Sequence, residues 1–176
     1  FCLLPDLPYL EPMLPALIEG GTKDLVVMST ISPTAVRGLA ERLQGQVDVM
    51  DACMSGGVAK AEDGTMSIMC GGPAEMFDRL RPLLDVIGGT VELMGDVGAG
   101  AVTKACNQMV VAGTLVALAE AAIVAKDNGL DVGHVLDVLG AGLAASELFR
   151  NTAPTFADRG LPGSAQAIPQ IGRAHV

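Results

Sequence analysis

The sequence predicts an α/β fold in which a sheet domain is followed by a helical region. Over the first 95 residues, short apolar runs alternate with helix-like segments in a βαβαβ rhythm, which is typical of a sheet with helical crossovers. After Gly98 the short runs stop and one long apolar segment follows. Half of the 176 residues are hydrophobic, so the chain can build a sizeable core.

The predicted strands are short apolar runs bounded by turn-forming residues. The clearest is Asp24-Leu-Val-Val-Met28, a continuous apolar run of the kind found in buried parallel strands. The first run, at the start of the chain, has the pattern of the tail of a strand. The predicted strands are residues 1–4, 24–28, 47–50, 65–70 and 90–94.

The helices are predicted from their start and stop signals. Ser32-Pro33 supplies an N-cap residue and a proline in the first turn, and Gly71-Gly72-Pro73 opens the next helix. Gly129 stands at the C-cap position of the long helix, and Asp131 is the N-cap of the one that follows. The predicted helices are residues 9–19, 33–43, 73–87, 101–128, 131–139 and 146–156.

The change of pattern predicts a domain boundary near residues 95–98. We expect residues 1–95 to form the sheet domain and residues 96–162 to begin an all-helical domain. Residues 163–176 have no hydrophobic periodicity, and their last seven can be back-translated into the start of a common sequencing-library adapter. We therefore expect an irregular tail that is non-native at its end.

Composition argues against several classes of partner. A net charge of −9 with 3% aromatic residues disfavours nucleic acid. Cys53, Cys70 and Cys106 lie in apolar runs without zinc-site spacing, so we expect reduced core thiols, no metal and a cytoplasmic location. The most apolar window, residues 109–125, is short for a bilayer and contains Glu120, so we expect no membrane partner.

A lysine and two amides share one face of the long predicted helix. Lys104, Asn107 and Gln108 stand at i, i+3 and i+4. A lysine whose stem lies along apolar surface is the ordinary interpretation, and it stays open. The neighbouring amides need partners, and Gly98 and Gly100 permit close approach of a ligand. Together they favour a general acid or base whose pKa burial would lower.

A second group of residues has the chemistry of an anion site. Ser55-Gly56-Gly57 come after the predicted strand 47–50, within a segment, 51–57, that we expect to be a turn. Ligands of such sheets bind at the carboxyl ends of strands. Two glycine N–H groups and a hydroxyl suit a carboxylate, at roughly 1.5–3 kcal/mol for each hydrogen bond. An ordinary turn is the alternative. Thr30, beyond another strand, either contacts a cofactor or simply precedes the Ser32 cap.

Several ordered segments together resemble the β-hydroxyacid dehydrogenase family, which includes 3-hydroxyisobutyrate dehydrogenases and tartronate semialdehyde (2-hydroxy-3-oxopropionate) reductases. Their order and separation, from residue 1 to about residue 157, make the resemblance specific. The segments are Leu4-Pro5-Asp6, Ser29-Thr30-Ile31-Ser32-Pro33, Asp51-Ala-Cys-Met-Ser-Gly-Gly57, Gly64-Thr65 through Gly71-Gly72, and Gly98-Ala-Gly100 with Lys104-Ala-Cys-Asn107-Gln108.

The resemblance implies part of a Rossmann-like domain that binds NAD or NADP, followed by a truncated all-helical domain. It implies hydride transfer between that cofactor and a small β-hydroxy acid, of the tartronate semialdehyde/glycerate or 3-hydroxyisobutyrate type. The implied roles are proton transfer by Lys104, carboxylate binding by Ser55, Gly56 and Gly57, substrate binding and lysine orientation by Asn107 and Gln108, and cofactor contact by Leu4, Pro5 and Thr30.

The sequence also departs from the family pattern. The Gly-x-Gly-x-x-Gly fingerprint, the opening βαβ unit and the late helices are missing, and Cys53-Met54 and Lys60 replace the usual Pro-Val and Gly. We therefore expect a fragment that is catalytically silent by itself, from a homo-oligomeric parent that is active. A non-catalytic binding relative that kept the fold is the alternative. A phosphoryl-transfer protein is disfavoured because no Gly-x-x-x-x-Gly-Lys-[Ser/Thr] loop is present.

Overall fold

The computed structural model describes residues 1–159, and the expected tail at 163–176 lies outside the described residues. The chain divides into two compact units, whose described parts are residues 1–106 and residues 107–159. The division falls inside one helix, because the first turns of that helix pack with the sheet. The predicted domains 1–95, 96–162 and 163–176 stay predictions.

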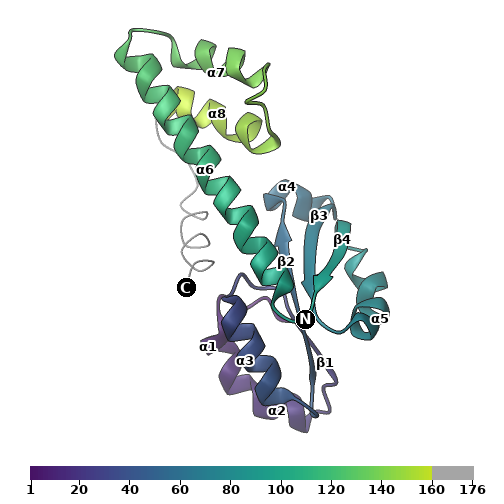
Figure 1. Ribbon diagram of the computed structural model, residues 1–176. Coiled ribbons are helices and arrows are strands. Elements are labelled where there is room, and N and C mark those ends of the chain that lie inside the picture. Colours follow the sequence, from purple (N-terminus) through teal and green to yellow (C-terminus); the bar gives the residue numbers. More distant parts are fainter. Residues whose placement is uncertain (160–176) are drawn as a thin grey trace. The chain divides into compact units, whose positions relative to one another are not determined.

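A four-stranded mixed sheet organises the first unit (Figure 1). Its order is β1 (Asp24–Val27), β2 (Asp48–Ser55), β3 (Met66–Gly71) and β4 (Gly88–Gly95). The pairs β1·β2 and β3·β4 are parallel, as expected for helical crossovers, and β2·β3 is antiparallel. The antiparallel step follows from the connection between β2 and β3, residues 56–65, which is shorter than a parallel crossover requires.

The helices of the first unit follow the predicted order, with one addition. The predicted helix 9–19 is broken into short pieces because Pro12 and Pro15 are tolerated only in a first turn. The predicted strand 1–4 contributes a single bridge between Cys2 and Val27. The sequence analysis missed α4. The elements are α1 (Leu7–Leu10), η1 (Glu11–Met13), α2 (Leu14–Glu19), α3 (Pro33–Leu43), α4 (Gly57–Glu62) and α5 (Ala74–Leu84).

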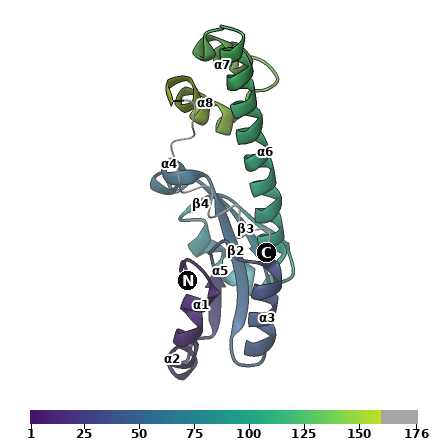
Figure 2. The same cartoon turned by 90° about the vertical axis from the view of Figure 1, so that its left-hand side faces the viewer.

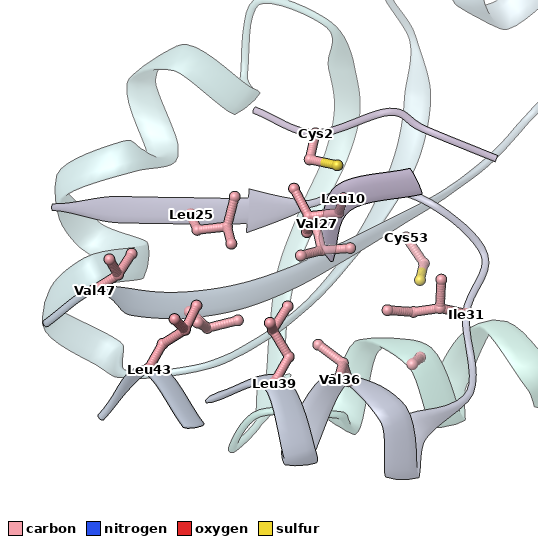
Figure 3. Close-up of a cluster of buried hydrophobic side chains, with 12 residues drawn as sticks. Cys2, Leu10, Leu25, Val27, Ile31, Val36, Leu39, Leu43, Val47 and Cys53 are labelled. Carbon is pink, nitrogen blue, oxygen red and sulfur yellow. The ribbon is translucent and has the colours of Figure 1, made fainter. Parts of the chain in front are cut away.

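Strand β2 separates two hydrophobic clusters. Val49 and Cys53 belong to the cluster that contains residues of α1 and α3, which Figure 3 shows in close-up. Met50 and Ala52 belong to the other cluster, which is covered by α5. Figure 2 shows α3 and α5 on opposite sides of the sheet. Because side chains alternate along a strand, odd-numbered residues of β2 all face the first cluster.

A long helix, α6 (Ala99–Asp127), begins in the first unit and continues into the second. Its C-cap is the predicted Gly129, at φ +72°, and the N–H of Leu130 donates to the carbonyl of Ala125. The predicted N-cap Asp131 accepts the N–H of His134 at 2.7 Å. The second unit is completed by α7 (Val132–Gly140) and α8 (Glu147–Arg159), which pack on α6 through Leu118, Leu136, Phe149 and Phe156.

Two expectations about α6 are wrong. Cys106 is exposed, whereas Cys53 and Cys70 are buried as predicted. Among residues 1–159, α6 is a helix long and apolar enough to cross a membrane by length and composition, and 22% of its apolar window is buried. The apolar stretch is therefore not too short for a bilayer. Core helices of other proteins pass the same test, so this finding is weak evidence for a membrane.

Candidate active site

Strand β2 carries several residues of the candidate site on one face. Asp51, Cys53 and Ser55 are two residues apart, so their side chains point to the same side of the sheet at steps of about 6.6 Å. The expected turn at 51–57 is wrong up to Ser55, because β2 continues that far. Its pairing extends from Asp51–Gly71 to Ser55–Ser67, and these backbone hydrogen bonds hold the segment extended.

The turn itself is formed by Gly56 and Gly57. Their φ angles are +147° and +73°, a region that favours glycine, and α4 starts at Gly57. A Cβ on Gly56 would lie 2.7 Å from the Cβ of Lys60, so this lysine packs directly against the turn. Ser55, which is half-buried, therefore stands at the end of a well-paired strand and beside a turn that only glycines can form.

Asp51 is the site residue that the sequence analysis missed. It is 0% exposed, and its two carboxylate oxygens accept the backbone N–H groups of Gly98 and Ala101, each at 2.6 Å. These are N–H groups at the start of α6, which have no partner inside the helix. Burial raises the pKa of Asp51, and the two N–H groups oppose that shift. An acidic residue inside an apolar strand was the available signal.

Lys104 lies one turn beyond this cap and is 5% exposed. Burial lowers the pKa of its ammonium group, and the nearby Cys53 opposes the shift. Burial in turn raises the pKa of the Cys53 thiol to about 12, so the thiol stays neutral; its Sγ donates to the carbonyl of Ser29 at 3.4 Å. A lysine whose pKa is lowered by burial can give up and regain a proton closer to neutral pH.

The predicted cofactor-contacting segments lie together at the carboxyl end of β1. The hydroxyl of Ser29 donates to the carbonyl of Leu4, which ties the segment Leu4-Pro5 to the segment Ser29-Thr30. Because β1 and β2 are parallel, this end lies on the same edge of the sheet as Cys53 and Ser55. The structure therefore brings Leu4, Pro5 and Thr30 near the end of β2 that carries Ser55.

Asn107 and Gln108 belong to the second unit. The side-chain amide of Asn107 donates to Oε1 of Gln108 at 2.9 Å, and Gln108 is 4% exposed. Since α6 is continuous, Gln108 follows Lys104 by four residues and lies on the same face of the helix. The predicted spacing of these three residues is therefore confirmed as a helical face.

A shallow cleft lies at the other end of β1 and β2 and contains none of the predicted site residues. It is lined by the first residues of both strands, Asp24 and Asp48, together with Lys23 and Arg79. Arg79 is already bound by Asp24, with Nη2 and Oδ1 2.5 Å apart. Among residues 1–159, no group of histidine, cysteine, aspartate and glutamate side chains is arranged to hold a metal.

Two family models cover most of the chain. The NAD binding domain of 6-phosphogluconate dehydrogenase matches residues 10–95. The NAD-binding domain of NADP-dependent 3-hydroxyisobutyrate dehydrogenase matches residues 98–167. Both are dinucleotide-binding modules, and they adjoin in the same order as the sheet and the helical region.

Curated proteins give a consistent result. Over 156 residues the chain is 35% identical to the 2-hydroxy-3-oxopropionate reductase of Escherichia coli (strain K12), covering 84% of this chain and 53% of that protein. Over 116 residues it is 40% identical to the 3-hydroxyisobutyrate dehydrogenase of Pseudomonas aeruginosa, covering 65% of this chain and 39% of that protein. The chain thus spans about half the length, or less, of the curated relatives it matches.

Solved structures agree. The 3-hydroxyisobutyrate dehydrogenase of Mycobacterium tuberculosis with L-serine superposes with a TM-score of 0.76 at 28% identity, over 86% of this chain and 53% of that one. The 3-hydroxyisobutyrate dehydrogenase of Salmonella typhimurium superposes with a TM-score of 0.81 at 26% identity, over 97% of this chain and 64% of that one. The chain thus shares the fold of these dehydrogenases.

Proposed function

We propose that this chain, which belongs to the β-hydroxyacid dehydrogenase family, is part of an NAD(P)-dependent oxidoreductase that acts on a small β-hydroxy acid. The enzyme would transfer a hydride between the nicotinamide and the hydroxyl-bearing carbon of the acid. The substrate is proposed to be of the tartronate semialdehyde/glycerate or 3-hydroxyisobutyrate type, because the relatives bear those names.

NAD or NADP is the cofactor that both matched models imply. The residues present suit its nicotinamide end, since Leu4-Pro5 and Ser29-Thr30 are tied together at the carboxyl end of a parallel strand pair. In this proposal Leu4, Pro5 and Thr30 contact the cofactor. When bound, the nicotinamide accepts or supplies the hydride.

Lys104 is proposed to move the proton. During oxidation its neutral amine would take the proton of the substrate hydroxyl, while the hydride passes from the hydroxyl-bearing carbon to the nicotinamide. The alcohol thereby becomes a carbonyl. During reduction its ammonium returns that proton to the carbonyl oxygen. The lowered pKa of Lys104 supports this role, because both protonation states must be reachable near the working pH.

The remaining site residues are proposed to hold the acid. Ser55 and the N–H groups of Gly56 and Gly57 would bind its carboxylate at the end of β2. Asn107 and Gln108, one turn beyond Lys104, would bind the substrate and orient the lysine. The exposed apolar residues of α6, among them Val110 and Val124, support a homo-oligomeric parent. We propose a cytoplasmic location, as for a metabolic enzyme.

The buried amine of Lys104 is the observation that carries this proposal, and its removal is the direct test. In the full-length parent, Lys104→Ala should lower kcat by about 10²–10⁴-fold, because general acid–base catalysis is lost. The Kd for the cofactor, measured by fluorescence titration, should stay nearly unchanged. Lys126→Ala, an exposed lysine of the same helix, is the matched control and should retain kcat. Near-normal kcat in the Lys104 variant would contradict the assignment.

A further inference from the structure

We infer that Asp51 is a positioning residue, which fixes the start of α6 and thereby the place of the Lys104 amine. The inference rests on the proposed function, in which that amine exchanges the proton with the substrate. Asp51 itself takes no part in the chemistry and acts only through the helix.

The attachment has two points. One carboxylate oxygen accepts the N–H of Gly98 and the other accepts the N–H of Ala101, both at 2.6 Å. A helix is usually capped by a residue next to it in the sequence. Here the capping residue comes from strand β2, 47 and 50 residues earlier, so the cap joins two elements of the fold. Two bonds from one planar group restrict both the translation and the tilt of the helix start.

The glycines around the carboxylate show how closely the helix approaches the sheet. A Cβ on Gly100 would lie 2.2 Å from the carbonyl oxygen of Met69 and 2.8 Å from Oδ2 of Asp51. A Cβ on Gly71 would lie 2.7 Å from Oδ1 of Asp51 and from the backbone N of Ala99. No larger residue fits at either position unless the helix moves away from the carboxylate.

The distance from this anchor to the lysine is short. Lys104 follows Ala101 by three residues, a rise of about 4.5 Å along the helix. Cys53 follows Asp51 by two residues, about 6.6 Å along the strand. Lys104 and Cys53 each influence the pKa of the other electrostatically, so the two groups lie near each other. A shift of about 1 Å in a reacting group can cost about 10²-fold in rate.

The test uses the 176-residue chain and needs no catalysis. Asp51→Asn keeps the size of the side chain but removes one acceptor and the charge. Amide hydrogen exchange at Gly98 and Ala101 should become at least about tenfold faster, while exchange at Met50, in the pairing of β1 with β2, stays unchanged. The pKa of Lys104, followed by NMR of labelled lysine, should move back toward its ordinary value because the amine becomes more hydrated.

The matched control is Asp48→Asn, an exposed aspartate of the same strand, which should change neither readout. An unchanged Lys104 titration in folded Asp51→Asn, with faster exchange at the two amides, would overturn the inference and leave Asp51 a structural cap. Gly100→Ala provides a second variant, which displaces the helix start while Asp51 itself is kept, and it should shift the Lys104 titration in the same direction.

If neither variant folds, wild-type exchange still tests the anchor on which the inference depends. Gly98 and Ala101 should exchange as slowly as Met50, and fast exchange at both amides would overturn the inference. The two proposals fail separately. A Lys104→Ala enzyme with normal kcat would remove the proposed function and leave the anchoring result intact. An unchanged lysine titration in Asp51→Asn would remove the anchor even if Lys104 proves essential.

Discussion

At the scale of single residues, the buried ammonium group of Lys104 is the feature that most needs an explanation. An ammonium loses much of its hydration in a protein interior, and the fold then favours the neutral amine. A charged lysine kept at 5% exposure on the inward face of a helix therefore lowers stability, and a functional role would explain why it is kept. In the proposed function, proton transfer is that role.

This cost predicts a pH-dependent stability. Because the folded pKa of Lys104 is lowered, the unfolded chain binds more protons between that pKa and the ordinary value of 10.5. The contribution of Lys104 to stability therefore improves as pH rises through that interval. Lys104→Met should have a higher Tm than wild type at pH 7, and the difference should shrink toward pH 10. Calorimetry of both proteins checks this, and a pH-independent difference would count against a buried ammonium.

The cysteines give a second prediction at this scale. The pKa of Cys53 is raised to about 12 and that of Cys70 to about 12, mainly by burial, whereas Cys106 is exposed. Since the thiolate is the reactive form, an aromatic disulfide reagent at pH 8 should label the native chain at Cys106 first. The labelling reaction, which is followed by absorbance, should have a fast phase from Cys106, and the Cys106→Ser variant should lack that phase. A fast phase that survives in that variant would mean that a buried thiol is accessible.

The sequence was sufficient to predict features that depend on local geometry, whereas the roles of these residues stay predictions. The i, i+4 spacing predicted that Lys104 and Gln108 share a helix face, and both are buried; the freedom of glycine to turn predicted the bend at Gly56 and Gly57. The capping role of Asp51 was not found, because its partners lie 47 and 50 residues away and only the folded sheet brings them together. Cys106 was misplaced for a related reason: an apolar run on a long helix does not reveal which side faces the core.

At the scale of elements, periodicity and cap signals predicted most helices and strands. The end of β2 was placed too early, since Asp51 to Ser55 lack a continuous apolar pattern but are held by pairing with β3. The antiparallel step and α4 were missed because a connection of that length has no strong sequence signal. These three errors concern the segment that carries Ser55, where β2 ends and a glycine turn begins.

The start of α6 offers a stability test at the element scale. Gly100→Ala should lower the free energy of unfolding by about 1–3 kcal/mol, because its Cβ would overlap the carbonyl of Met69. Gly113→Ala in the same helix meets no atom within 4 Å and should raise it by up to about 1 kcal/mol. Urea denaturation of both variants compares them. A Gly100 variant as stable as the Gly113 variant would show that the helix start is loosely packed.

At the scale of the whole molecule, the chain brings together several features of the proposed active site. It has the end of a parallel strand pair, a glycine turn and a buried lysine, and it spans about half the length of its curated relatives. The fold class and the family were predictable because several motifs occur in the right order. The exposed apolar residues of α6 could not be assigned from sequence, because helical periodicity does not say what covers a face.

The expected silence of the chain by itself is a prediction at this scale. The 176-residue protein, mixed with NADH or NADPH and tartronate semialdehyde, should show no loss of absorbance at 340 nm above the blank. The physical reason is that its sequence lacks the glycine-rich fingerprint that cradles a dinucleotide pyrophosphate. The full-length parent under the same conditions is the positive control. Turnover by the short chain would contradict this expectation.

The most direct measurement of the central claim is chemical rescue of Lys104→Ala in the full-length parent with a small primary amine such as ethylamine. If the Lys104 amine exchanges the proton, turnover should be low without amine and rise saturably with its free-base concentration. The Lys126→Ala control should show no such dependence. A Lys104→Ala enzyme that turns over at the wild-type rate with no amine present would contradict the account.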